Sequence, residues 1–190
     1  MITIIGLGNP GKEYEGTRHN AGRDAALLIA KKNDFPEFRL NKKANALVSE
    51  GKIGKTKVII ALPETFMNKS GNAVAKLVRP KKELRELVVL HDDLDIEVGC
   101  IKISFGKNSG GHKGVESVMR AIKTKQFVRI RIGVCPKKKP GTEKQILNFI
   151  VGKFSPTEQP IMKKTQKHVV ETIETMAEYS LERAMSEFNK

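Results

Sequence analysis

Residues 1–11 read MITIIGLGNPG, an apolar run that passes directly into a glycine-rich loop. A run this short and this rich in isoleucine is typical of a strand buried in the middle of a sheet. Because further apolar runs alternate with segments of helical spacing, the sequence predicts an α/β fold. We expect a single-domain sandwich in which a mixed, mostly parallel central sheet carries helices on both faces. The expected strands are 2–7, 46–49, 58–62, 87–91, 101–105 and 128–134, and the expected helices are 21–32, 72–78 and 115–122.

The chain changes in character from residue 155 onward. Ser155-Pro156-Thr157-Glu158 resembles a helix start with proline at the first helical position. Residues 136–141, PKKKPG, read as a basic loop, and no stretch resembles an interdomain linker, so one domain is expected to span residues 1–190. A long C-terminal helix is expected from about residue 156, because an apolar stripe follows the start; the stripe consists of Ile161, Val169, Ile173, Met176 and Leu181.

The chain carries a large excess of positive charge. Its 35 Lys and Arg residues outnumber its 21 Asp and Glu residues, which gives a formal net charge of +14 and a pI near 9.8. Such a surplus favours a polyanionic partner, although a lysine-rich solvated surface gives the same count. Charge alone leaves tRNA, DNA and a membrane surface open as partners.

The two cysteines, Cys100 and Cys135, are far apart in the sequence. Their spacing suggests neither a redox dithiol nor a zinc site, so we expect buried free thiols. The apolar N-terminus lacks a basic leader segment, and no stretch reaches the ~20 apolar residues of a membrane helix. We therefore expect a cytoplasmic protein without membrane association.

The loop after the first strand, Gly6-Leu7-Gly8-Asn9-Pro10-Gly11, matches GxGxxG and raises the hypothesis of a dinucleotide site. In dinucleotide-binding folds the last glycine opens a helix, and an acidic residue follows about 20 positions later. Here Pro10 stiffens the loop and residues 12–17 prolong it, so the context argues against that hypothesis. A tight strand exit with positive φ at its glycines is the plainer interpretation.

Four polar clusters lie at expected strand ends, where open α/β sheets place their ligand sites. They are TRHN at 17–20, TFMNKSG at 65–71, HDDLD at 91–95 and GKNSGGHKG at 106–114. Each alone has a plain structural interpretation, such as helix capping by His19 or Asn68, or a flexible connection at the glycine-rich loop. Because Asn9, His19, Asn68, Asp92 and His112 all fall at strand ends, we predict one functional site built from them.

The acidic cluster supports two interpretations. Asp92, Asp93 and Asp95 could bind Mg²⁺ through carboxylate oxygens, as in a metal-dependent phosphohydrolase. The chain offers no obvious second carboxylate cluster and no Walker loop, however. An Asp that orients an imidazole is the more economical role, because His19 and Asp92 follow neighbouring strand exits. The glycine-rich loop, with its backbone N–H groups and cations, is suited to holding phosphate or a substrate backbone.

In order along the chain, the blocks GLGNPGKEYEGTRHNAG, TFMNKSG, HDDLD, GGHKG and FIVGKFSPTE resemble the signature blocks of bacterial peptidyl-tRNA hydrolase. The resemblance covers nearly the whole chain. It implies an α/β sandwich, a monomer, and hydrolysis, without metal or cofactor, of the ester joining a peptide to the 3′ ribose of its tRNA. The implied partner is peptidyl-tRNA, contacted at its 3′ end and acceptor stem, with no obligate protein partner and no membrane.

The resemblance also implies roles for single residues. His19 corresponds to the base that takes a proton from water, and Asp92 to the acid that fixes the tautomer of that base. Asn9 resembles the residue that separates blocked from free aminoacyl ends, and Asn68 resembles a substrate-positioning amide. Amides near Asn68 or the glycine-rich loop would stabilise the oxyanion. Tyr14 and Phe66 match positions that contact the tRNA end. Together with the residues singled out above and below, the expected substrate and tRNA contacts are Tyr14, Phe66, Met67, Asn68, Lys107, Gly111, His112, Lys113 and Arg131.

Two positions depart from the family pattern. The glycine-rich block normally reads GGHNG, whereas this chain has Lys113 in the place of the Asn, and the preceding strand has Ser104 where a second lysine is usual. Lys107, Lys113 and Arg131 could supply the missing cation and hold a terminal phosphate.

These departures leave a second function open. Some relatives, such as plant organelle intron-splicing factors, resemble the hydrolase but serve as RNA-binding partners. A catalytically impaired RNA-binding relative is therefore the alternative, and Lys113 is the feature that favours it. Retention of both His19 and Asp92 favours the enzyme.

Overall fold

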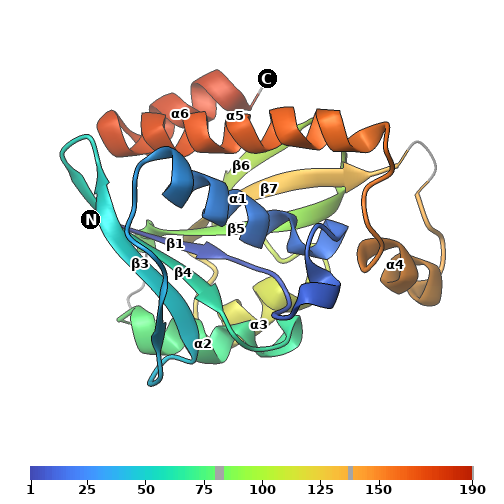
Figure 1. Ribbon diagram of the computed structural model, residues 1–190, viewed down its shortest axis with the longest axis horizontal. Coiled ribbons are helices and arrows are strands. Elements are labelled where there is room, and N and C mark those ends of the chain that lie inside the picture. Colours follow the sequence, from blue (N-terminus) through green and yellow to red (C-terminus); the bar gives the residue numbers. More distant parts are fainter. Residues whose placement is uncertain (80–83, 137–138, 190) are drawn as a thin grey trace.

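The structure is a computed structural model that describes residues 1–79, 84–136 and 139–189. Figure 1 shows a central sheet between two layers of helices. The strands are β1 (Ile2–Gly6), β2 (Arg39–Asn41), β3 (Ala46–Ile53), β4 (Thr56–Pro63), β5 (Leu84–Glu97), β6 (Ile101–Phe105) and β7 (Phe127–Cys135). The α-helices are α1 (Ala21–Lys32), α2 (Ser70–Leu77), α3 (Lys113–Ile122), α4 (Glu143–Ile150), α5 (Glu158–Glu178) and α6 (Leu181–Phe188). Short 3₁₀ turns precede some of them: η1 (Lys12–Tyr14), η2 (Arg18–Asn20) and η3 (Met67–Lys69).

In the part of the chain that the structure describes, seven strands form one sheet in the order β2-β3-β4-β1-β5-β7-β6. The central strands β4, β1, β5 and β7 run parallel, whereas β3 and β6 pair antiparallel with their neighbours. The predicted mixed, mostly parallel sheet is confirmed. Because parallel strands end at the same edge, the segments after β1 and β4 come together there with β5.

Successive side chains of the central strands feed two hydrophobic cores on opposite faces of the sheet. Ile4 of β1 packs in the core under α1, α5 and α6, while its neighbour Ile5 packs in the core with α2 and α3. In Figure 1, α5 and α6 lie above the sheet together with α1, and α2 and α3 lie below it. The predicted helices on both faces are confirmed, and the continuous apolar sequence of β1 follows from this double burial.

The glycines after β1 allow α1 to approach the sheet closely. A Cβ atom at Gly6 would lie 2.6 Å from the Cβ of Ala26, and one at Gly22 would lie 2.2 Å from the carbonyl oxygen of Leu90. Positive φ was predicted for the glycines of this loop, but of Gly6, Gly8 and Gly11 only Gly11 has it, with φ of 109°. Lack of space for a side chain, rather than a positive φ, explains why glycine occupies positions 6 and 8.

Several predicted boundaries were wrong. Strand β5 does not end at His91 but continues to Glu97, so Asp92 lies within the strand. The predicted C-terminal helix is split, because Ser180 accepts a hydrogen bond from the N–H of Arg183 and starts α6 as a separate helix. Helix α5 begins at Glu158.

Three side chains are more exposed than predicted. Ile161 of the predicted apolar stripe is 45% exposed. The cysteines were expected to be buried, but Cys100 is exposed and Cys135 is half-buried. Neither has a disulfide partner within the described residues. Among those residues no helix is both long and apolar enough to cross a membrane.

Candidate active site

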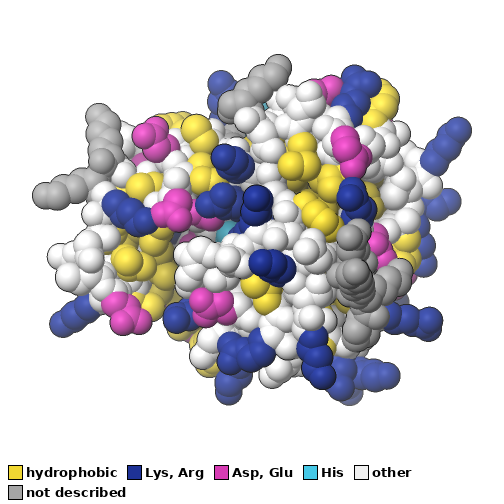
Figure 2. All heavy atoms as spheres, turned by 180° about the vertical axis from the view of Figure 1, so that it is seen from behind, with side chains coloured by type: hydrophobic (Ala, Val, Ile, Leu, Met, Phe, Trp, Pro, Cys, Tyr) yellow, Lys and Arg dark blue, Asp and Glu magenta, His cyan; other side chains and the backbone are white. Residues whose placement is uncertain are grey.

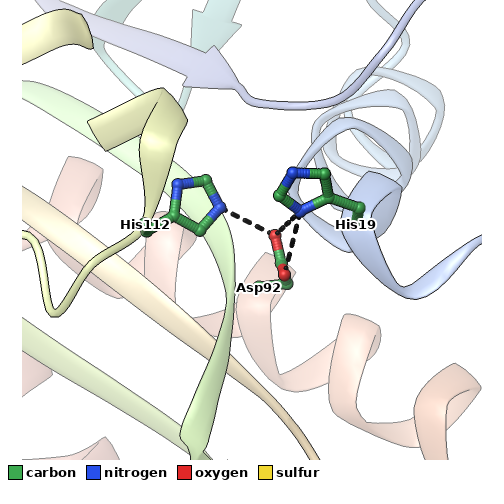
Figure 3. A group of neighbouring side chains, drawn as sticks. All are labelled: His19, Asp92 and His112. Atoms are coloured by element: carbon green, nitrogen blue, oxygen red, sulfur yellow. Dashed lines mark hydrogen bonds and ion pairs between the residues drawn. The ribbon is translucent and has the colours of Figure 1, made fainter. Parts of the chain in front are cut away.

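Three side chains from distant parts of the sequence meet beside β5 (Figure 3). His19 lies on the turn η2 just before α1, Asp92 lies in β5, and His112 is the N-cap residue of α3. The parallel pairing of β1 with β5 brings the segment after β1 next to Asp92. The predicted meeting of His19 and Asp92 is thus present, and His112 completes it from the other side.

Asp92 bridges the two imidazole rings. Its Oδ1 lies 2.9 Å from Nδ1 of His19 and 2.8 Å from Nε2 of His112, and its Oδ2 lies 3.1 Å from Nδ1 of His19. The carboxyl is nearly inaccessible to solvent, with 4% of its side chain exposed. Burial alone would raise the pKa of Asp92, but the two histidines outweigh that effect and hold it well below its usual range. Asp92 is therefore a buried carboxylate.

The position of the proton on His112 follows from its second set of contacts. Nδ1 of His112 accepts hydrogen bonds from the backbone N–H groups of Gly114 and Val115, at 3.1 and 3.2 Å. An accepting nitrogen carries no proton, so in the neutral ring the proton must be on Nε2. His112 therefore caps α3 with one nitrogen and donates from the other to Asp92 (Figure 3).

His19 presents the opposite tautomer. Its Nδ1 faces the Asp92 carboxylate, which can only accept, so Nδ1 carries the proton and Nε2 keeps the free lone pair. Nε2 points away from Asp92 in Figure 3. Burial opposes protonation of the ring, but the charge and hydrogen bond of Asp92 outweigh it and raise the pKa of His19 above its usual value. The result is an oriented imidazole base.

A third histidine, His91, contacts the backbone of Asp92. The fully buried His91 donates from Nδ1 to the backbone carbonyl of Asp92 at 2.7 Å, and its Nε2 lies 3.3 Å from the guanidinium of Arg129. Burial, together with the nearby His112 and Arg129, holds the pKa of His91 well below its usual value. Burial also lowers the pKa of Arg129 to about 10. Arg129 also donates to the carbonyl of Asn108 at 2.7 Å. Through its contacts with His91 and Asn108, Arg129 connects β5 to the glycine-rich loop.

Asn9 links the loops after β1 and β4. Its side-chain oxygen accepts from the backbone N–H of Met67 at 2.8 Å, and its backbone N–H donates to the side chain of Asn20 at 2.8 Å. The amide of Asn20 donates back to the carbonyl of Asn9 at 3.0 Å. The oxygen of the Asn9 side chain is thereby occupied and its orientation fixed, which leaves the NH₂ group as the donor that can face a ligand. Asn9 is joined to the turn of His19 through Asn20.

A cavity of about 670 Å³ opens beside the three side chains. Its polar side contains His19, Asp92 and His112, and its apolar side contains side chains of α4; the latter are Ile146, Leu147 and Ile150. Helix α4 stands at the edge of the molecule in Figure 1. Figure 2 shows hydrophobic side chains on the side where α4 lies, next to basic and acidic ones. The site is therefore a cleft with one polar and one apolar wall.

Asp93 and Asp95 of the acidic cluster already pair with basic side chains, which argues against the predicted alternative of a magnesium site. Oδ2 of Asp93 accepts from Nε of Arg131 at 2.7 Å, and Asp95 pairs with Lys139. The ligand atoms of His19, Asp92 and His112 do lie within 4.8 Å of one another. A metal on Nε2 of His112 would have to displace the proton that the helix cap keeps there, so this set suits hydrogen bonding better than a metal.

The remaining predicted site residues fall into two groups. Phe66, Asn68, Lys107, Gly111 and Lys113 are exposed around the site loops, and Tyr14 is half-buried. Two others point elsewhere: Met67 is 5% exposed and packs against Gly114, and Arg131 is held by Asp93. Of the predicted basic loop at residues 136–141, Lys137 and Lys138 lie outside the described residues.

Sequence reasoning missed three features of the site. The contact of His112 with Asp92 had no sequence signal, because it depends on which nitrogen caps α3. The buried Arg129 was also not foreseen. Helix α4 could have been found, since Thr142 and Gln145 form a capping box that the spacing Thr-x-x-Gln announces.

Comparison with known proteins relates the whole chain to one family. The family model described as "Peptidyl-tRNA hydrolase" matches residues 3–190. Peptidyl-tRNA hydrolases of Alkaliphilus oremlandii and Caldanaerobacter subterraneus subsp. tengcongensis are each 39% identical to this chain over 190 residues, with both chains covered completely. A crystal structure of peptidyl-tRNA hydrolase from Acinetobacter baumannii is similar with a TM-score of 0.90 at 30% identity, covering 100% of this chain and 94% of that chain.

Proposed function

The chain belongs to the peptidyl-tRNA hydrolase family, and on that premise we propose that it hydrolyses the ester bond between peptide and tRNA with a water activated by His19. The observation that carries this proposal is the Asp92 carboxylate, which fixes the tautomer of His19 and leaves Nε2 as a base at the cavity. The reaction releases a free peptide and returns the tRNA of aborted translation to use.

The chemistry balances without a covalent intermediate on the protein. Nε2 of His19 takes a proton from water, and the resulting hydroxide attacks the ester carbonyl carbon. The imidazolium is stabilised by Asp92, which stays ionised. When the tetrahedral intermediate collapses, the bond between the carbonyl carbon and the ribose oxygen breaks, and His19 returns the proton to that oxygen.

Asn9 and Asn68 bind the substrate and take no part in the proton transfer. Asn9 offers its NH₂ group as a donor, because its oxygen is held by the backbone of Met67. Asn68 is exposed on η3, at the same edge of the sheet, and offers a second amide. Donors of this kind bind the carbonyl of the acyl group and stabilise the negative charge that develops on it.

The tRNA end is held by exposed cations. Lys107 and Lys113 extend from the glycine-rich loop and the first turn of α3, and the ammonium group of Lys113 lies 3.9 Å from Glu116, with 67% of its side chain exposed. Each has the reach and freedom to contact a phosphate. Arg131 contributes less to this contact than the sequence predicts, because its guanidinium is already paired with Asp93.

Two further properties follow from the family premise. The protein acts in the cytoplasm, where its substrate is made, and it acts as a monomer. The three side chains around Asp92 come from one chain, so no second copy is needed to complete them. Analytical ultracentrifugation with and without tRNA tests the monomer directly.

The test of the proposed function is hydrolysis of an N-acetyl-aminoacyl-tRNA by the wild-type protein in EDTA. We expect release of the N-acetyl-amino acid, and slower release from the same aminoacyl-tRNA with a free amino group. An RNA-binding relative without activity would bind the tRNA but release nothing. Activity that EDTA abolishes and Mg²⁺ restores would instead favour the metal-dependent alternative.

A further inference from the structure

Arg18, the residue directly before His19, directs its side chain at one distant segment of the chain, residues 149–158. Its guanidinium donates to the carbonyl of Lys153 at 2.8 Å, to the carbonyl of Phe149 at 3.4 Å and to the carboxylate of Glu158 at 2.7 Å. It also stacks 4.1 Å from the centroid of the Phe149 ring. These contacts reach across more than 130 residues of sequence, and 9% of the side chain is exposed. Arg18 is thus a buried clamp on the segment between α4 and α5.

The backbone repeats the same connection. The N–H of Arg18 donates to the carbonyl of Gly152 at 3.0 Å, and Thr17 forms an isolated β-bridge with Lys153. The turn that carries His19 and the end of α4 are therefore joined at both the main chain and the side chain. The cation also lies at the C-terminal end of α4, where the helix dipole favours positive charge.

Helix α4 needs such an anchor. None of its residues is buried, although Ile146, Leu147 and Ile150 form the apolar wall of the cavity. Shortly before α4 in the sequence, Lys139 pairs with Asp95, but both side chains are about half exposed, and exposed ion pairs contribute little to stability. The buried contacts of Arg18 hold the helix more firmly than that pair does.

We propose that Arg18 is a positioning residue that fixes the apolar wall of the cavity to the turn carrying His19. Arg18 does not line the cavity itself, so it acts through Phe149 and the main chain of 149–153 and not on the substrate. The apolar wall receives the acyl portion of the substrate, and Arg18 sets its distance from the base. This proposal rests on the proposed function for its kinetic part only.

The test compares Arg18→Lys with Arg23→Lys. Lysine keeps the charge but loses the planar group that binds several acceptors and stacks on Phe149. Arg23 is a matched control on the neighbouring α1: it is similarly enclosed, with 13% of its side chain exposed, and it bonds to Pro63 and Glu64 and not to α4. Both variants lose comparable buried contacts, but only one of them releases α4.

Two readouts are measured for each variant. In Arg18→Lys we expect amide hydrogen exchange in α4 to rise on the order of tenfold. We also expect kcat/KM on N-acetyl-aminoacyl-tRNA to fall on the order of tenfold, chiefly through KM, with the pKa of the acid limb unchanged. Arg23→Lys should leave both readouts near wild type. Phe149→Leu should raise KM too, and its effect should add little to that of Arg18→Lys, because both changes remove the same contact.

The exchange experiment needs no activity, so the clamp and the hydrolase are tested separately. Unchanged protection of α4 in Arg18→Lys would overturn the proposal even if the enzyme is active. An equal rise of KM in Arg18→Lys and Arg23→Lys would overturn it as well, because a general loss of stability would then explain the effect.

Discussion

At the scale of single residues, Asp92 connects the two histidines of the site. One carboxylate accepts a hydrogen bond from each of two histidines; this contact fixes the tautomer of His19, and the helix cap fixes that of His112. A buried charge is costly unless hydrogen bonds satisfy it, so the two donors that fix the base also keep the acid ionised. Of the two rings, His112 is committed to the cap of α3, and only His19 has a nitrogen free to act as a base.

The first prediction concerns the pH profile of Asp92→Asn. Only neutral His19 can accept a proton, so activity rises as the pH passes through its pKa, which Asp92 raises above its usual value. Asparagine removes the charge, so the midpoint of the acid limb should move to lower pH. The maximal rate should also fall, by about 10²- to 10⁴-fold, because an amide can stabilise the wrong tautomer. The measurement is kcat/KM against pH, and a midpoint that does not move would show that Asp92 is structural.

The second prediction concerns Lys113, where this chain departs from its family. Its side chain is largely exposed at the start of α3, and its ammonium group faces Glu116. Lys113→Asn should therefore change kcat/KM only modestly while it weakens tRNA binding at low salt. Steady-state hydrolysis by both proteins at two salt concentrations measures this. A wild type without turnover, beside a strongly active Asn variant, would favour the RNA-binding alternative.

At the scale of elements, the site lies where the turn before α1 and the N-terminus of α3 meet β5. The sequence was sufficient to predict β1, the central strands and the approach of His19 to Asp92, because apolar runs mark strands buried on both faces and parallel strands end together. It was not sufficient for β2, which has three exposed residues and no pattern to detect. The engagement of Arg129 also could not be predicted, because which buried group an arginine in a strand contacts depends on tertiary packing.

Helix α1 contributes a third prediction. Asp24 lies beside Arg23 and Glu15, and burial raises its pKa to about 6. An acid whose folded pKa is raised destabilises the fold above that pKa and not below its unfolded value near 3.8. Asp24→Asn should therefore raise the free energy of unfolding by about 1 kcal/mol at pH 8 and by much less at pH 4.

Urea denaturation at the two pH values measures this difference. Glu171→Gln, which removes an exposed carboxylate from α5, is the control and should show no comparable dependence on pH. If Asp24→Asn changed the free energy of unfolding equally at both pH values, burial would not be destabilising the Asp24 carboxylate.

At the scale of the whole molecule, the chain has a formal net charge of +14. On the face that Figure 2 shows, basic side chains are scattered over the surface and are not gathered in one stripe. We expect charge distributed in this way to attract tRNA, and we expect the cations next to the cavity to position its end.

The fourth prediction follows from that division. The affinity for tRNA should fall steeply with salt, and loss of one phosphate contact should flatten the log–log slope by roughly 0.7 to 0.9. We expect this change for Lys107→Gln. Lys55→Gln is the control, since Lys55 lies in the turn before β4, at the opposite edge of the sheet from the site. Equal changes in both variants would contradict a tRNA contact at the glycine-rich loop.

The central claim is that His19 activates the water that cleaves the ester. Single-turnover hydrolysis of N-acetyl-aminoacyl-tRNA by wild type and His19→Ala, with the tRNA affinity of both measured in parallel, tests it most directly. The imidazole acts in the chemistry while phosphate contacts dominate binding, so the rate should fall on the order of 10³-fold or more with nearly unchanged affinity. A His19→Ala variant that retains activity within about tenfold of wild type would contradict the account.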